Sequence, residues 1–205
     1  MSMEKNIEKK EVKKGLVICN IGAGKGKTTA AFGTCIRASG AGMSVHIMQF
    51  VKAKKRDDQD HRKEGEWPLS AEIDFLNAIT IPDGFGKITN EQVGLGFVGI
   101  LGDTKEKEIH ITAAREGLER AKEVLKSERY DVVFLDELVS ALEVGLISED
   151  NIVEVIKAKP EQTHLIITGH NRYEKILALC DMVTEMKMIQ HPYYKGILAQ
   201  RGIDY

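Results

Sequence analysis

The sequence has no long hydrophobic run and no excess of one charge. None of its apolar stretches is long enough to span a bilayer, so we expect no membrane partner. Its 29 lysines and arginines nearly balance 31 aspartates and glutamates, which gives a formal net charge of -2. A bulk electrostatic attraction to nucleic acid is therefore not expected either.

Cysteine is also scarce. The three cysteines, Cys19, Cys35 and Cys180, show no paired spacing, which favours reduced, packed thiols over a disulfide or zinc framework. Residues 1–14 are rich in lysine and glutamate and lack the apolar core of a signal peptide, so they predict a charged N-terminal arm. We expect a cytoplasmic protein with one domain over 15–205, which is long enough to bury a core without cross-links.

A glycine-rich stretch follows a short apolar run near the N-terminus. Residues 15–20 predict a buried strand, and Thr28 predicts the start of a helix. Strand, glycine-rich turn, Gly-Lys-Thr and helix in this order are typical of a phosphate-binding P-loop, whose backbone N–H groups, helix dipole and lysine attract phosphate. The predicted ATP-binding residues of the loop are Gly22, Ala23, Gly24, Lys25, Gly26, Lys27, Thr28 and Thr29.

The P-loop pattern assigns roles and also shows one irregularity. Lys27 is expected to reach the terminal phosphates, and the Thr28 hydroxyl is expected to bind a magnesium ion. The usual first glycine position holds Ile21, and the first glycine comes one residue later, at Gly22. We therefore expect a tighter loop. A glycine-rich turn without a ligand is the alternative, which the order of strand, turn and helix disfavours.

Apolar strand patterns alternate with helical patterns along the remaining chain. The helix of residues 103–126, with Asp103 or Thr104 as its cap, is the clearest of these. The other predicted helices are 28–39, 148–159 and 176–180, and the predicted strands are 45–51, 130–138, 163–168 and 182–186, with 71–81 a helix or a strand. This alternation predicts an α/β protein with a mainly parallel sheet and helices on both faces, of the P-loop NTPase-like (RecA-like) class.

Two acidic residues end one of these predicted strands. Four apolar residues lead directly into Asp136 and Glu137, which favours a functional pair over a surface acidic pair. Ligands of parallel sheets bind at the carboxyl ends of the strands, so these carboxylates should face Thr28 and add a second magnesium contact. His46 and Gln49, by contrast, fit ordinary sheet residues better than ligands. Residue chemistry thus supports a magnesium–ATP site and leaves ATPase, kinase and other ATP-using transferases open.

Residues 82–102 contain many glycines beside apolar residues. This composition fits a loop that moves over an apolar ligand and equally fits a poorly ordered linker.

Several motifs together resemble the ATP:corrinoid adenosyltransferases of the P-loop type. They are residues 22–33, Gln49-Phe50-Val51-Lys52, Leu135-Asp136-Glu137-Leu138, Ile167-Thr168-Gly169 and the tail 196–205. The resemblance extends from about residue 15 to residue 205. Ala23 stands where the family usually has asparagine, and His170 where it often has arginine. The family's Gly-Phe-Thr-Trp segment has candidates only at Phe97 and Phe85, and neither has the tryptophan.

The resemblance implies transfer of the 5′-deoxyadenosyl group of ATP to the Co(I) centre of a corrinoid, with release of triphosphate, in adenosylcobalamin biosynthesis or salvage. It implies catalytic roles for Lys27, Thr28 and Glu137, magnesium on Thr28 with Glu137 or Asp136, and assistance by Arg37 at ATP. Phe97, or Phe85, would contact the corrinoid. An external flavoprotein reductant and a homodimer are also implied. Cobalamin, cobinamide and cobyrinate diamide all remain open as substrates, and an ATPase, a kinase or a non-catalytic binding module remain the alternative functions.

Overall fold

The computed structural model describes residues 14–51, 70–95, 106–200 and 202–203. Its centre is one sheet of six strands that all run parallel, in the order β3-β2-β4-β5-β1-β6. The strands are β1 (Val17–Ile21), β2 (Val45–Gln49), β3 (Ile88–Gln92), β4 (Val132–Asp136), β5 (His164–Thr168) and β6 (Met182–Glu185).

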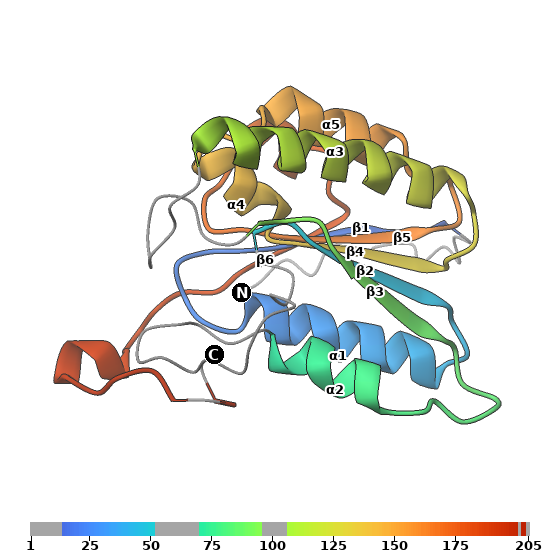
Figure 1. The fold of residues 1–205 in the computed structure, drawn as a ribbon, viewed down its shortest axis with the longest axis horizontal. Coiled ribbons are helices and arrows are strands. Elements are labelled where there is room, and N and C mark those ends of the chain that lie inside the picture. Colours follow the sequence, from blue (N-terminus) through green and yellow to red (C-terminus); the bar gives the residue numbers. More distant parts are fainter. Residues whose placement is uncertain (1–13, 52–69, 96–105, 201, 204–205) are drawn as a thin grey trace, which may run out of the picture.

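Helices cover both faces of the sheet (Figure 1). One face carries α1 (Lys27–Gly40) and α2 (Ala71–Ala78). The other face carries α3 (Lys107–Lys126), α4 (Leu138–Glu143), α5 (Glu149–Lys157) and α6 (Glu174–Leu177). A short 3-10 helix, η1 (Pro192–Lys195), lies in the C-terminal segment. The predicted α/β class, with a parallel sheet between two helical layers, is confirmed.

The central strands are buried along their whole length because both faces of the sheet are covered. On the α1 side, the ring of Phe32 packs edge-on against Phe134, with their centroids 5.6 Å apart. On the other side, Leu118 and Leu125 of α3 and Ile152 of α5 close the larger part of the core. These two apolar layers explain why β1 and β4 read as continuous hydrophobic runs in the sequence.

Three local expectations need correction. The glycine-rich region contains a strand, β3, whose sequence Ile-Thr-Asn-Glu-Gln is polar because it forms a half-exposed sheet edge. The strand expected to reach residue 138 ends at Asp136, and α4 begins at Leu138. Helix α3 begins at Lys107 with Glu106 as its N-cap, whereas the expected caps at 103 and 104 lie outside the described residues.

The expected cap of α5 is confirmed. Ser148 caps α5 through a reciprocal pair of hydrogen bonds with Asn151. All three cysteines are free, and Cys19 and Cys35 are buried. Within the described segments, no helix is both long and apolar enough to cross a membrane.

Candidate nucleotide-binding site

The loop between β1 and α1 is held by backbone hydrogen bonds to both neighbouring strands. The N–H of Gly22 donates to the carbonyl of His170, just after β5, over 2.9 Å. The N–H of Gly24 donates to the carbonyl of Met186, just after β6, over 2.8 Å. The loop is therefore anchored at two points on the carboxyl edge of the sheet.

Glycine is required in this loop for two different physical reasons. Gly22 (φ 111°) and Gly26 (φ 104°) adopt left-handed backbone conformations, which other residues rarely adopt. At Gly24 the constraint is space, because a Cβ there would lie 2.7 Å from the Met186 carbonyl oxygen. Ile21, at the position where the usual motif has glycine, is still part of β1 and is 1% exposed. The glycines therefore begin only where the chain leaves the sheet.

Lys27 lies at the centre of the loop. Its Nζ donates to the carbonyl oxygens of Gly22 (2.7 Å) and Gly24 (2.9 Å), so the loop curls around the ammonium group. Burial lowers the pKa of Lys27 below its usual value, while the nearby charges of Glu137 and Glu143 act in the opposite direction. Lys27 is also the first residue of the 14-residue helix α1, so the positive end of that helix dipole adds to its charge.

Asp136 lies beside the P-loop threonine, fully buried at the end of β4. Its Oδ1 accepts hydrogen bonds from the hydroxyls of Thr28 (2.8 Å) and Thr168 (2.9 Å). Its Oδ2 accepts one from Nε2 of Gln49 (3.0 Å). Three donors from three different elements therefore compensate the cost of burying this carboxylate.

Glu137 turns the chain from β4 into α4. It has left-handed dihedral angles (φ 59°, ψ 23°), and its N–H donates to the Thr168 hydroxyl over 2.7 Å. One of its carboxylate oxygens, Oε2, is buried. The Thr28 hydroxyl and the carboxylates of Asp136 and Glu137 are all hard oxygen donors, the kind that Mg²⁺ prefers.

Glu143 supports the β5 side of the loop. Its Oε1 accepts from the backbone N–H groups of His170 (2.9 Å) and Asn171 (2.6 Å). Burial raises the pKa of Glu143, but hydrogen bonds from His170 and Asn171 outweigh that effect, so the pKa lies below its usual value. This carboxylate fixes the same segment whose His170 carbonyl receives the Gly22 N–H.

The structure thus brings together the loop of residues 22–29, Asp136 and Glu137. It does not bring Arg37 to the loop: this residue is exposed in the last turn of α1, about 15 Å along the helix axis from Lys27. Phe85 is 51% exposed. It precedes β3 and therefore lies at the amino ends of the parallel strands, away from the carboxyl ends that carry the P-loop. Phe97 lies outside the described residues.

Sequence reasoning took Gln49 for an ordinary sheet residue, whereas its side chain bonds Asp136, and it assigned no role to Thr168 or Glu143. Gln49 and Thr168 are the last residues of buried apolar strands, and a polar residue in that position was the available signal. Glu143 had no such signal, because helix α4 itself was not expected.

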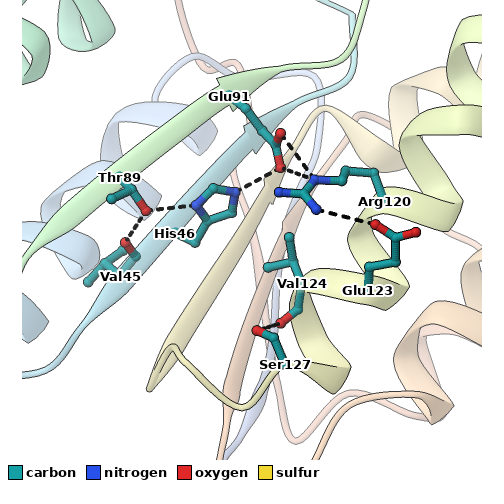
Figure 2. Close-up of polar contacts among 8 residues, drawn as sticks. All are labelled: Val45, His46, Thr89, Glu91, Arg120, Glu123, Val124 and Ser127. Carbon is teal, nitrogen blue, oxygen red and sulfur yellow. Dashed lines mark hydrogen bonds and ion pairs between the residues drawn. The ribbon is translucent and has the colours of Figure 1, made fainter.

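A second polar cluster, on β2, β3 and α3, involves other partners (Figure 2). The ring of His46 bonds Thr89 through Nδ1 (2.8 Å) and Glu91 through Nε2 (3.0 Å), and Nε of Arg120 donates to the same Glu91 carboxylate. The ring also stacks on Tyr130, with centroids 4.8 Å apart. These contacts fit the expectation that His46 is a sheet residue. Among the described side chains, no group of three or more His, Cys, Asp and Glu residues could hold a metal ion.

The strand order clarifies the class of protein. Strand β5 lies between the strand that leads into the P-loop and the strand that ends in the acidic pair. A P-loop, a threonine hydroxyl on a buried aspartate and this inserted strand define a RecA-like P-loop nucleotide-binding protein.

Comparison with known proteins identifies the family. The family model described as "ATP:corrinoid adenosyltransferase BtuR/CobO/CobP" matches residues 13–205. The chain belongs to this family. It is 35% identical to the corrinoid adenosyltransferase of Escherichia coli K12, over 94% of this chain and 86% of that protein. It is 32% identical to a corrinoid adenosyltransferase of Sinorhizobium sp. (98% and 86%) and 30% identical to the corrinoid adenosyltransferase CobA of Salmonella typhimurium LT2 (99% and 92%).

Proposed function

We propose that this protein transfers the 5′-deoxyadenosyl group of ATP to the Co(I) centre of a corrinoid and releases triphosphate, in the biosynthesis or salvage of adenosylcobalamin. The observation that carries the proposal is family membership over residues 13–205, together with an assembled P-loop and acidic pair. In this reaction the Co(I) electron pair forms the bond to C5′, and the bond from C5′ to the triphosphate oxygen breaks. Neither step needs a protein nucleophile or general base.

The protein's part in this chemistry is to bind and orient ATP and to stabilise the leaving group. The N–H groups of the loop and the N-terminus of α1 would face the triphosphate. Lys27 would exchange its hydrogen bonds to the Gly22 and Gly24 carbonyls for bonds to phosphate oxygens. Negative charge that develops on the departing triphosphate would then lie beside a partly buried ammonium group.

We further propose that Mg²⁺ binds with ATP at Thr28, Asp136 and Glu137. The carboxylates of Asp136, Glu137 and Glu143 all act electrostatically on Lys27. Their combined negative charge exceeds the charge of Lys27 and would therefore attract a further cation. Mg²⁺ usually takes one or two carboxylates plus substrate phosphates, which suits a site that is not a complete protein cage. When bound, the ion would neutralise charge on the triphosphate.

For the corrinoid, we propose contact with Phe97. The carboxyl end of β3, at Gln92, lies on the P-loop edge of the sheet, and Phe97 follows five residues later in the sequence. Phe85 precedes β3 and so lies at the amino ends of the strands. Its neighbour Gly86 forms hydrogen bonds with Ser39, near the end of α1. An apolar wedge at Phe97 would displace the lower cobalt ligand and make Co(II) easier to reduce by an external flavoprotein. Phe97→Ala should slow mainly the reaction that starts from Co(II), and Phe85→Ala, as the control, should not.

The proposal includes a homodimer and a cytoplasmic location. The C-terminal segment exposes large apolar side chains, among them Ile189 (90% exposed) and Leu198 (79%), and such surface favours a protein partner. Light scattering on the purified protein measures the assembly state, and a monomer at all concentrations would contradict the dimer. We propose a cytoplasmic location because the reaction consumes ATP and because Co(I) persists only in reducing surroundings.

One experiment tests the activity. The protein is incubated anaerobically with magnesium–ATP and chemically reduced cobalamin, cobinamide or cobyrinate diamide, while the visible spectrum of the corrinoid is followed and the phosphate product is identified. We expect the spectrum of an adenosylated corrinoid and intact triphosphate. ADP with free phosphate would instead indicate an ATPase, and ADP with the γ-phosphate transferred to an acceptor would indicate a kinase. ATP binding without any spectral change would indicate a non-catalytic binding module.

A further inference from the structure

Thr168 is placed where the two halves of the site meet. It is the last residue of β5, which pairs with β1 on one side and with β4 on the other. Strand β1 leads into the P-loop and strand β4 ends at Asp136. The side chain of Thr168 is therefore presented between the loop and the acidic pair, and the residue is only 1% exposed.

The hydroxyl of Thr168 contacts both members of the acidic pair. It donates to Oδ1 of Asp136 over 2.9 Å and accepts from the N–H of Glu137 over 2.7 Å. A threonine hydroxyl has one proton and two acceptor positions, so both bonds form at the same time. One side-chain oxygen thus helps to orient the Asp136 carboxylate and also constrains the backbone at Glu137.

The backbone at Glu137 is in a conformation that depends on contacts such as the hydrogen bond to Thr168. Its left-handed conformation is uncommon for a residue with a side chain and persists only when the surroundings determine it. The bond from the Glu137 N–H to Thr168 is one such determinant, and it fixes the backbone from which the Glu137 side chain projects as α4 begins.

The Asp136 carboxylate has the same dependence on Thr168. Its Oδ1 is shared between the hydroxyls of Thr28 and Thr168, and Gln49 holds its Oδ2. Without the Thr168 hydroxyl, the donor on the β5 side is lost, while Thr28 and Gln49 still attract the carboxylate from α1 and β2. Its orientation toward Thr28 would then be less well determined.

We propose that Thr168 is a positioning residue for metal-dependent ATP binding. It acts by holding Asp136 and Glu137 in register with Thr28. This inference rests on the magnesium–ATP site proposed above and does not depend on which acceptor receives the adenosyl group.

The test compares three variants. Thr168→Val keeps the shape and removes the hydroxyl, and Thr168→Ser keeps the hydroxyl and removes the methyl group. Thr163→Val is the matched control: Thr163 directly precedes β5, is also buried (4% exposed) and donates to the Tyr130 carbonyl over 3.3 Å, at the far end of the strand. Thermal unfolding of each variant measures the general cost of losing a buried hydroxyl.

The readout is the dissociation constant of ATP measured by calorimetry, once with magnesium and once with a chelator. We expect magnesium to strengthen ATP binding by the wild-type protein. Thr168→Val should reduce this magnesium-dependent gain by about 10- to 100-fold, which is the usual effect of removing a residue that orients metal ligands. Thr168→Ser and Thr163→Val should retain most of the gain.

The inference is overturned if Thr168→Val keeps the wild-type gain, if Thr163→Val loses as much, or if Thr168→Val weakens ATP binding equally with and without magnesium. If Thr168→Val does not fold, the Thr168→Ser variant provides the test. A folded serine variant that has lost the magnesium-dependent gain in ATP affinity overturns the inference. A wild-type protein indifferent to magnesium would overturn the metal assignment itself. Because no corrinoid is present, a failure of adenosyl transfer leaves this result unaffected.

Discussion

The shape of the P-loop can be tested with a single methyl group at Gly24. The backbone of Gly24 is outside the left-handed region, so alanine can adopt its conformation and only space opposes the substitution. The added Cβ would lie 2.7 Å from the Met186 carbonyl oxygen and 2.9 Å from that of Lys187. Both neighbours are backbone atoms after β6, which cannot rotate away as a flexible side chain can.

The size of the effect follows from these distances. Favourable contacts between non-bonded heavy atoms lie near 3.5–4.0 Å, so loop and strand exit must separate by about 1 Å. Overpacking of this kind typically costs 1–3 kcal/mol, and the hydrogen bond from the Gly24 N–H to Met186, worth about 1 kcal/mol, is lost as well. We therefore expect Gly24→Ala to cost about 2–4 kcal/mol.

Two measurements show whether the substitution lowers the stability of the fold or the affinity for ATP. If it destabilises the folded protein, Tm should fall by about 4–16 °C for a chain of this size. If the loop instead relaxes into a conformation that binds nucleotide poorly, calorimetry should show ATP binding weakened by about 30- to 700-fold. Gly33→Ala is the control, because a Cβ there meets nothing within 4 Å on α1, and alanine should slightly stabilise that helix. Unchanged Tm and unchanged ATP affinity in Gly24→Ala would refute the reasoning.

Two further predictions concern charge. Lys27→Ala should weaken ATP binding by about 100-fold and abolish turnover, because the variant loses the charge-assisted hydrogen bonds that Lys27 is proposed to make to phosphate oxygens, about two at roughly 1.5 kcal/mol each. Calorimetry measures this, with the exposed Lys126→Ala as control, and equal losses in both variants would contradict it. Burial lowers the pKa of His46 below 6.5, against the opposing effect of Glu91, so the folded state binds a proton less readily than the unfolded state. The contribution of His46 to the free energy of unfolding should therefore be fully present above about pH 6.5 and should be lost as the pH falls below that value. His46→Asn should reduce that slope in denaturant titrations while leaving the similar contribution of His164, and an unchanged slope would count against the assignment.

The sequence was sufficient to predict the P-loop, the acidic pair and the class of fold. Residues 15–29 carry the loop because strand, turn and helix N-terminus are consecutive, so their geometry is set by local backbone preferences. Asp136 and Glu137 were recognisable because a buried strand leads into them. The alternation of strands and helices predicted the parallel sheet, since each crossover leaves a periodic pattern of its own.

The partners of Asp136 depended on the order of the strands. Thr28 is 108 residues away from Asp136 and Thr168 is 32 residues away, yet both hydroxyls bond the same oxygen because β5 inserts between β1 and β4. No local pattern encodes which strands become neighbours, because that choice depends on how helices from distant parts of the chain pack on the two faces. The roles of Gln49 and Thr168, and the separation of Phe85 from the P-loop edge, were therefore decided only by the folded sheet.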